Sequence, residues 1–445
     1  MAGIKTYVND AQYIDLDNTP SFLTTTTFSM ATADATNFHI GRRLKLFDTT
    51  TLYGTINSIS STFVSVRLDS GILSTSLSSV ALAVVTNTNP SLPEHVYKRK
   101  NMIINGQMDI WQRGASFQLS ASSGTMYTTD RFGIELSSTA QITITRSERS
   151  ANASNVPTLA QCGVFLNNAL LISISAADAV LAAGEYCQLT TKIEGYDWRQ
   201  IAHKPTILSF WVQSDTTGTY CIAARNSNAG RSFVQEYAIS AANTWEKKTI
   251  QIPEAPTAGT WDYSSGLGLN ITWALGIGTT YQGGAGNWTA ANLLATSNQT
   301  NLMASAGQMW AIAGIQLEEG QVVTPLEIRP YAQELQLCKR YAYTINGNLA
   351  PTVVGVVYGA ELAFITLPLQ VEMRTSPTLI QPTSILDYFL TTGNGGSNTL
   401  SSVAISNAKP DSVRFIVHVQ NAVLVGGNAT EFITGAANFI LDAEL

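Results

Sequence analysis

The sequence predicts an all-β protein made of several small domains and containing one short helix. Short runs of apolar and β-branched residues recur along most of the chain, separated by stretches rich in Gly, Ser, Thr and Asn. Only residues 331–343 show the apolar spacing of a helix. Because 445 residues are too many for one ordinary core, the sequence predicts roughly two to four domains.

Residues 1–86 are predicted to form a small N-terminal β-barrel or β-sandwich. Their strand-like runs are residues 43–47, 51–57, 62–68 and 80–85. Residues 87–100 are predicted to be a linker, because Pro90 and Pro93 stand there among polar residues that favour neither helix nor central strand.

Residues 101–330 are predicted to form a jelly-roll β-sandwich. The strand-like runs are residues 141–145, 186–191, 206–212, 219–224 and 248–252. In the run 206–212, Leu208, Phe210 and Val212 face one way, while the opposite face, which includes Trp211, is mixed. A strand with one apolar and one mixed face is typical of a two-sheet sandwich.

The predicted helix, residues 331–343, begins just after Pro330 and places Leu335, Cys338 and Ala342 on one face. Residues 344–445 return to strand-like runs separated by Gly-, Ser- and Asn-rich loops. We expect them to form a C-terminal β-sandwich. Its last strand-like run, residues 439–445, is expected to be built into the fold.

The composition excludes several classes of protein. Charged residues make up 13% of the chain, against about 25% in typical soluble proteins, so the surface must carry mostly neutral polar groups. Such a surface suits a protein that works outside the cell or that packs against identical copies. The net charge of −6 argues against nucleic-acid binding, which normally requires a basic face.

The sequence also lacks membrane and secretion signals. No run approaches the roughly 18 consecutive apolar residues of a membrane helix. Residues 1–8 lack the apolar core of a signal peptide, so synthesis in a cytoplasm is expected. The four cysteines, at positions 162, 187, 221 and 338, show no CxxC spacing and are expected to be buried free thiols.

Motifs of metal sites and enzymes are missing from the sequence. The four histidines, at positions 39, 95, 203 and 418, do not have the spacing of metal ligands. There is no GxSxG, no HExxH and no phosphate-binding glycine loop. We therefore predict no metal, no cofactor and no enzymatic activity.

Paired carboxylates could still cleave a polysaccharide, since glycosidases need two acids placed about 5–10 Å apart. The candidates are Asp109, Asp130, Glu185, Glu194, Asp197 and Glu236. The sequence brings no two of them together. Asp109 and Asp130 lie near Arg113 and Arg131, which favours ion pairs or hydrogen bonds within the fold over catalysis.

Aromatic residues suggest where a sugar could bind. All eight tryptophans lie between Trp111 and Trp310, and a Trp ring matches the C–H face of a sugar. Trp211 and Trp245 lie in or beside strand-like runs and are expected in the core. The candidates for glycan binding are the loop aromatics Trp261, Tyr263, Tyr281 and Trp288. Capping the sandwich edge or filling a subunit interface is an equally favoured role for them.

Several short motifs carry a family resemblance. The first is Asn101-Met-Ile-Ile-Asn-Gly-Gln-Met-Asp-Ile-Trp-Gln-Arg-Gly-Ala-Ser-Phe117, followed by Tyr127-Thr-Thr-Asp-Arg-Phe132. Further matches follow in order at residues 208–212, 313–320, 326–330, 334–341, 371–377 and 442–445. Together they resemble a domain that recurs in bacteriophage tail fibre and virion fibre proteins. Residues 208–211 and 243–249 also resemble the jelly-roll domains of carbohydrate-binding modules.

The resemblance marks six residues as a structural motif of the first strands of the domain. They are Asn105, Asp109, Trp111, Arg113, Asp130 and Arg131. It also implies a homotrimer located in the virion and assembled in the bacterial host cytoplasm. The N-terminal module would dock on other virion proteins of the tail, the portal-adaptor or the capsid, and the distal β-domains would meet a host surface glycan.

Three functions remain open at this point. The first is a tail fibre or receptor-binding structural protein that adheres to host surface glycans by many weak contacts. The second is a capsid head fibre or decoration spike. The third is a polysaccharide depolymerase. The sequence favours the first, because its motifs are most familiar in tail proteins, but it does not separate tail from head.

Overall fold

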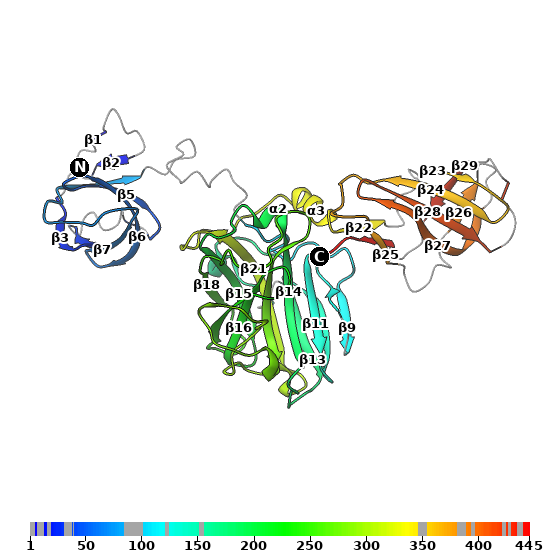
Figure 1. Ribbon diagram of the computed structural model, residues 1–445, viewed down its shortest axis with the longest axis horizontal. Helices are drawn as coiled ribbons and strands as arrows, with labels where there is room; N and C mark the ends of the chain where they lie inside the picture. The colour runs from blue at the N-terminus through cyan, green and yellow to red at the C-terminus, as the bar shows by residue number, and fades with distance from the viewer. Residues whose placement is uncertain are drawn as a thin grey trace. The chain divides into compact units, whose positions relative to one another are not determined.

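The computed structural model confirms the all-β class (Figure 1). It describes residues 5–6, 13–15, 19–30, 38, 40–83, 101–120, 124–150, 155–345, 354–380, 389–392, 397–420, 424–425, 429–433 and 439–445. The chain divides into two compact units, Met1–Lys100 and Asn101–Leu445. The predicted linker, residues 87–100, lies outside the described residues.

The first unit contains one eight-stranded sheet with the order β1-β2-β8-β5-β6-β7-β4-β3. Its strands are β1 (Lys5–Thr6), β2 (Tyr13–Asp15), β3 (Ser21–Thr24), β4 (Thr27–Ser29), β5 (Arg43–Phe47), β6 (Thr51–Ser60), β7 (Phe63–Leu68) and β8 (Ser79–Ala83). Alternate residues of these strands, such as Leu44, Leu46 and Val66, pack into one core. The period-two pattern of the sequence thus gives the predicted small β-module.

The second unit begins with a β-sandwich of the jelly-roll kind. Its seven-stranded sheet has the order β10 (Met126–Tyr127), β11 (Phe132–Ser137), β14 (Tyr186–Glu194), β19 (Leu267–Ile277), β16 (Gly218–Arg225), β17 (Ser232–Ile239) and β20 (Trp288–Thr289). The six-stranded sheet has the order β18 (Glu246–Ile252), β15 (Thr206–Ser214), β21 (Met309–Glu319), β13 (Asn168–Ala176), β12 (Gln141–Glu148) and β9 (Ser116–Ser120).

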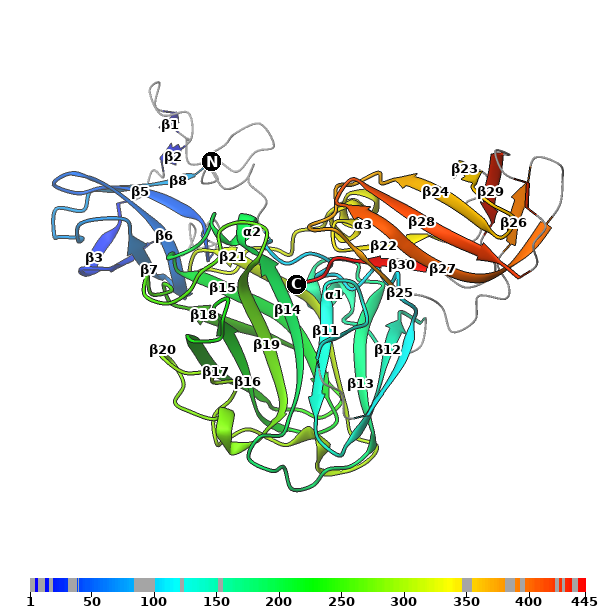
Figure 2. The same ribbon diagram turned by 45° about the vertical axis from the view of Figure 1, so that its right-hand side comes forward.

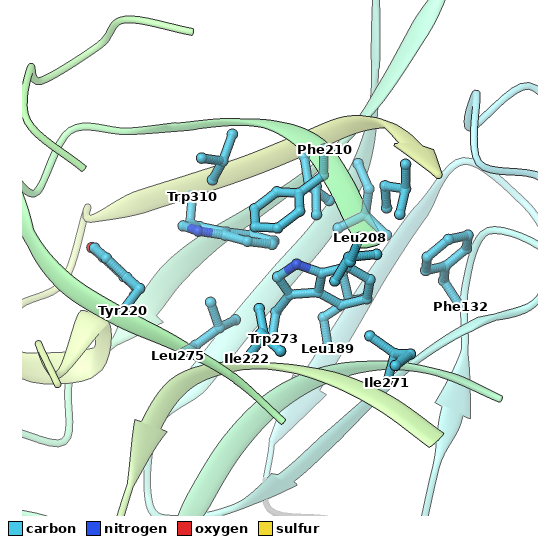
Figure 3. Packing of buried hydrophobic residues seen from close by; sticks show 14 of the residues in the cluster. Phe132, Leu189, Leu208, Phe210, Tyr220, Ile222, Ile271, Trp273, Leu275 and Trp310 are labelled. Carbon is cyan, nitrogen blue, oxygen red and sulfur yellow. The ribbon is translucent and has the colours of Figure 1, made fainter. Parts of the chain in front are cut away.

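The two sheets enclose one large apolar core (Figure 3). Phe210 packs edge-on against Trp273, with ring centroids 5.7 Å apart. Leu208, Phe210 and Val212 all point into this core, as the sequence predicts. Trp211 and Trp245 instead belong to a smaller apolar cluster outside this core, so their predicted core position is only partly right.

The described part of the chain contains three short α-helices and two 3-10 turns. They are α1 (Leu159–Cys162), α2 (Gly195–Trp198), η3 (Thr279–Tyr281), η4 (Leu302–Ala304) and α3 (Tyr331–Lys339). α3 ends four residues before the predicted helix end at residue 343. The reason is tertiary, because Ala342 begins strand β22 (Ala342–Ile345), which pairs with β30 (Phe439–Asp442). None of these described helices is long and apolar enough to span a membrane.

The C-terminal module is a closed six-stranded barrel in place of the predicted β-sandwich (Figure 2). Its strands in ring order are β23 (Val354–Val357), β24 (Leu362–Pro368), β28 (Ser412–Val419), β27 (Ser397–Lys409), β26 (Phe389–Thr392) and β29 (Ala429–Ile433). β29 pairs with β23 and closes the ring. Two register shifts in the long strand β27 bend it, which helps a sheet to curl shut. β30 lies between β22 and β25 (Thr378–Ile380) in a separate three-stranded sheet.

The four cysteines are unpaired, in agreement with the predicted free thiols. Cys187, Cys221 and Cys338 are buried, whereas Cys162 is half-buried. Burial raises the pKa of the Cys187 thiol to about 12, so this group stays protonated and unreactive.

Candidate functional site

The motif residues of the first strands form a buried polar cluster, which we call the motif network. Asn105 is at its centre, with a positive φ of 59° that Asn tolerates better than most residues. The Asn105 side-chain amide donates to the carbonyl oxygens of Ile110 and Asp130 and to the hydroxyl of Thr129. Its Oδ1 accepts from the backbone N–H of Ile110. Asn105 therefore ties two motif segments together.

Asp130 and Arg113 form the charged part of the motif network. Asp130 is fully buried and accepts hydrogen bonds from the backbone N–H and the side-chain amide of Gln112. Arg113 Nη1 lies 3.5 Å from Asp130 Oδ1. Burial raises the pKa of Asp130 to about 6, and the positive charge of Arg113 opposes this rise only in part.

Residues 442–445 complete the motif network from the far end of the chain. The carboxylate of Glu444 bonds to both Arg113 and Arg131. Arg113 also lies 3.1 Å from Asp442. The guanidinium of Arg131 stacks on the ring of Tyr341 at 3.5 Å from the ring centroid. Two buried cations are thereby neutralised by a segment more than three hundred positions later in the sequence.

Two further ion pairs, each with a buried carboxylate, involve residues of the later motifs. Arg329 lies 3.1 Å from Glu334, whose carboxylate also accepts from the backbone N–H of Asn105. Glu194 accepts from Arg340 and from the Tyr341 hydroxyl. These residues lie in or beside helix α3, so they attach the helix to the sandwich. None of these residues is among the six that the resemblance marks as the structural motif. All of them except Glu194 nevertheless lie in the sequence stretches that carry the resemblance.

Asp109 and Trp111 have simpler roles. Asp109 accepts from the side-chain amide of Asn168 at 2.9 Å, and burial raises its pKa. Trp111 donates from Nε1 to the carbonyl oxygen of Met108 at 2.7 Å and packs against the main core. Both contacts lie within the fold.

Three of the four predicted glycan-binding aromatics gather in one cluster, which we call the rim cluster. Trp261 stacks on Trp198, with centroids 5.5 Å apart, and meets Trp288 edge-on at 5.7 Å. His203 lies edge-on to Trp261 at 5.9 Å and tilted to Tyr263 at 6.2 Å. Trp261 is thus enclosed by other rings, and Tyr263, at 42% exposed, is the most open member.

Hydrogen bonds fix His203 within the rim cluster. Its Nδ1 lies 2.8 Å from the carbonyl oxygen of Ala255, and its Nε2 lies 2.8 Å from the hydroxyl of Tyr263. A carbonyl only accepts, so Nδ1 must carry a hydrogen, and the neutral ring then accepts from Tyr263 through Nε2. The rim cluster is therefore packed and hydrogen-bonded within itself, which agrees better with capping an edge than with an open sugar platform.

Tyr281 lies apart from the rim cluster, on the outer face of the seven-stranded sheet. It meets Tyr186 edge-on, with centroids 5.7 Å apart, and both rings are half-buried. Both rings pack against a small apolar cluster that includes Cys221 and Ala274. Because Cys187 and Leu189 point into the main core, Tyr186 and its alternate neighbours on β14 must point outward.

Two buried polar side chains on this outer face have unpartnered atoms. Arg225 is 8% exposed; its Nη1 donates to Asn292 at 3.0 Å and its Nη2 to Thr272 at 3.4 Å. Its Nε has no partner among the described residues. Gln188 is 2% exposed; its Nε2 donates to Glu135, while its Oε1 has no described partner.

We call Tyr186, Tyr281, Gln188 and Arg225 the tyrosine face. Burial lowers the pKa of Arg225, and the carboxylate of Glu135 partly offsets this effect. Burial also raises the pKa of the Tyr186 hydroxyl, with Glu135 adding to the rise. Buried polar atoms in proteins are nearly always paired, so a lone donor and a lone acceptor on one sheet face require an explanation.

Sequence reasoning found only Tyr281 of the tyrosine face. The signal for the others was alternation: Tyr186 and Gln188 are outward residues of a predicted strand, and Arg225 directly follows another predicted strand. Their placement on one face of the sheet depends on β19, which lies between β14 and β16. No local pattern in the sequence indicates this order of strands in the sheet.

The carboxylates considered for catalysis are mostly taken by partners in the fold. Glu236 accepts from Thr296 and Asn298, and Glu185 accepts from the backbone N–H of Ala182. Asp109, Asp130 and Glu194 have the partners described above. Among the described residues no group of His, Cys, Asp and Glu has the arrangement of a metal site.

Comparisons with known proteins give only distant similarities. No family model matches this sequence. No curated protein matches it either. The similar solved structures include three carbohydrate-binding modules. One is described as CBM4; it is 13% identical, covers 48% of this chain and 98% of its own, and has a TM-score of 0.23. Another is the family 11 module of the cellulase Lic26A-Cel5E of Clostridium thermocellum. It is 15% identical, covers 47% of this chain and 96% of its own, and has a TM-score of 0.22.

The third is TmCBM61 in complex with β-1,4-galactotriose, which is 11% identical, covers 42% of this chain and 88% of its own, and has a TM-score of 0.22. At identities and scores this low, the likenesses carry no conclusion about function. The function must therefore be argued from the residues of this chain.

Proposed function

We propose that this chain is a bacteriophage virion fibre protein, of the tail fibre or receptor-binding kind, that adheres to glycans on the host surface. The ordered motifs of residues 101–445 support the family, since their polar side chains meet in one motif network. The low share of charged residues, 13%, supports a protein that works outside the cell.

The tyrosine face is the observation that carries the proposed adhesion. Arg225 Nε is an unmet donor and Gln188 Oε1 is an unmet acceptor. A sugar hydroxyl both donates and accepts, so hydroxyl groups satisfy both atoms, whereas a carboxylate cannot donate to Gln188. The rings of Tyr186 and Tyr281 add apolar surface of the kind that sugar C–H faces contact.

Binding at the tyrosine face requires a local change. Both unmet atoms are closed off from solvent. The half-buried tyrosine pair is the more exposed part of this face, so a shift of Tyr281 away from Tyr186 is the step that we propose opens it. The unmet hydrogen bonds offset part of the cost of that shift, because leaving a buried polar group unpaired costs about 1–3 kcal/mol.

The mechanism that we propose is adhesion without chemistry. Each sugar contact would be weak, and a homotrimer would multiply it by avidity, because a second site binds at high effective concentration once the first is engaged. The N-terminal module would attach to other virion proteins. No bond would be made or broken, and the protein would act in the virion.

Cryo-electron microscopy of the intact virion tests the location. Three copies around each tail attachment point would agree with the proposal. Three copies on capsid vertices would make the chain a head fibre and would overturn the tail assignment. Release of oligosaccharides from host polysaccharide by the purified chain would overturn the non-enzymatic mechanism in favour of a depolymerase.

A further inference from the structure

A groove of about 550 Å³ lies between strand β18, at the edge of the six-stranded sheet, and strand β17, which is next to the outermost strand β20 of the seven-stranded sheet. This volume is within the range of small-molecule sites, roughly 300–1,000 Å³. We call it the edge groove. Its polar lining includes Gln235, Thr249, Gln251 and Gln321, and its apolar lining includes Phe233 and Ile250.

The edge groove is uncharged apart from one acid. None of its described lining residues is a cation. The single carboxylate, Glu236, already accepts from Thr296 and Asn298. An anionic ligand would find no counter-charge there and would meet the negative charge of Glu236. The lining therefore fits a neutral ligand rich in hydroxyl groups, because glutamine amides both donate and accept hydrogen bonds.

A peptide strand is a poorer occupant than a sugar. Strand β18 is an outermost strand of its sheet, and such edges recruit extended peptides unless they are protected. Lys247 and Lys248 lie in β18, and Pro253 follows it directly. Lysines and prolines at an edge oppose the addition of a strand.

The segment after β19 links the edge groove to the tyrosine face. Gly286 lines the groove and donates to the carbonyl oxygen of Val234 at 2.8 Å. Trp288 donates from Nε1 to the carbonyl oxygen of Pro253, another lining residue, at 3.1 Å. Tyr281 and Asn292 of the same segment contact residues of the tyrosine face. The segment 281–292 therefore borders both the edge groove and the tyrosine face.

We propose that the edge groove is a second saccharide site, which binds a neutral oligosaccharide segment independently of the tyrosine face. The ligand class rests on the proposed function, whereas the site itself rests on the groove and its uncharged lining. Two sites in one sandwich raise the affinity for a long glycan over that for a single ring.

The test uses the full chain and an array of neutral and uronic-acid-containing oligosaccharides of different lengths. The strongest neutral binder is then titrated by calorimetry against wild type, Gln235→Ala, Gln251→Ala and Arg225→Met. Gln118→Ala is the matched control, because Gln118 is an exposed glutamine in β9, the opposite edge strand of the six-stranded sheet. Thermal unfolding verifies that each variant is folded.

Two bound segments per chain are expected, with a roughly three- to tenfold loss of affinity in each groove variant and none in Gln118→Ala. If wild type binds one segment, Arg225→Met abolishes binding and the groove variants bind like wild type, the edge groove is overturned and the proposed adhesion stands. If no oligosaccharide on the array binds wild type, the adhesion and the groove are both overturned.

Discussion

Two buried arginines show how the motif network differs from the tyrosine face. Arg131 is 2% exposed and is paired with Glu444, bonded to the Lys192 carbonyl oxygen and stacked on Tyr341. Arg225 is 8% exposed, bonds to neutral groups and keeps Nε unpartnered among the described residues. The fold neutralises the first cation for its own stability. The second keeps a donor without a described partner, which is why we propose that it meets a ligand.

The largest expected effect is on stability and comes from Glu444→Ala. This change leaves Arg113 and Arg131 buried with one carboxylate fewer, and breaking a buried pair costs about 3–5 kcal/mol. The free energy of unfolding is measured in urea. The control Glu148→Ala removes an exposed partner of Arg146 and should cost at most about 1 kcal/mol. Equal effects of the two changes would mean that the motif network does not hold the fold.

A direct comparison of the two arginines comes next in size. Arg131→Met leaves the buried carboxylate of Glu444 with one ion-pair partner fewer and should cost about 3–5 kcal/mol. Arg225→Met strands no buried charge but removes the donor to Asn292 and to buried Thr272, so its cost in unfolding free energy should be about 1–3 kcal/mol while sugar binding is lost. If Arg225→Met destabilises the chain as much as Arg131→Met, Arg225 is a structural residue.

The pH dependence of stability tests the charge of the motif network. Burial raises the pKa of Asp130 to about 6 from 3.8, so the folded state holds this proton more tightly than the unfolded state does. The stabilising contribution is present below the unfolded pKa and is lost as the pH rises through about 6. The free energy of unfolding of wild type minus that of Asp130→Asn should therefore fall between pH 4 and pH 7, by on the order of 1–3 kcal/mol. A flat difference would contradict the raised pKa.

The smallest effect on stability is expected at the tyrosine face. Tyr281→Ala removes a half-buried ring from its edge-on contact with Tyr186, and such ring pairs contribute about 0.5–1.5 kcal/mol. Sugar affinity should nevertheless fall. Exposed Tyr331 lies in helix α3, so Tyr331→Ala is the matched control and should change neither quantity. Unchanged sugar affinity in Tyr281→Ala would show that the Tyr281 ring is not part of the binding site.

The sequence predicted the strands better than it predicted their partners. The run at residues 43–47 coincides with β5, and the run at residues 206–212 lies within β15, because alternation is a local signal. The closed C-terminal barrel was missed because closure depends on β29 pairing with β23, which lies far away in the sequence. The helix was predicted too long because pairing of Ala342 with Asp442 overrides the apolar spacing.

The candidate site could be predicted only in part for a related reason. Loop aromatics are visible in the sequence, yet Trp261 packs between other rings while Tyr281 meets Tyr186 on the outer face of the seven-stranded sheet. Exposure is a tertiary property that residue type does not give. Arg225 and Gln188 carry no motif, and their significance lies in hydrogen bonds that the fold leaves unmade.

The most direct test is oligosaccharide binding by wild type and Arg225→Met on the same array, with Arg414→Met as a control. Arg414 is an exposed arginine of β28, in the C-terminal barrel. Wild type and Arg414→Met should bind the same neutral oligosaccharides, and Arg225→Met, folded to the same degree, should bind them at least tenfold more weakly. Equal binding by all three chains, or no binding by wild type, would contradict the proposed adhesion.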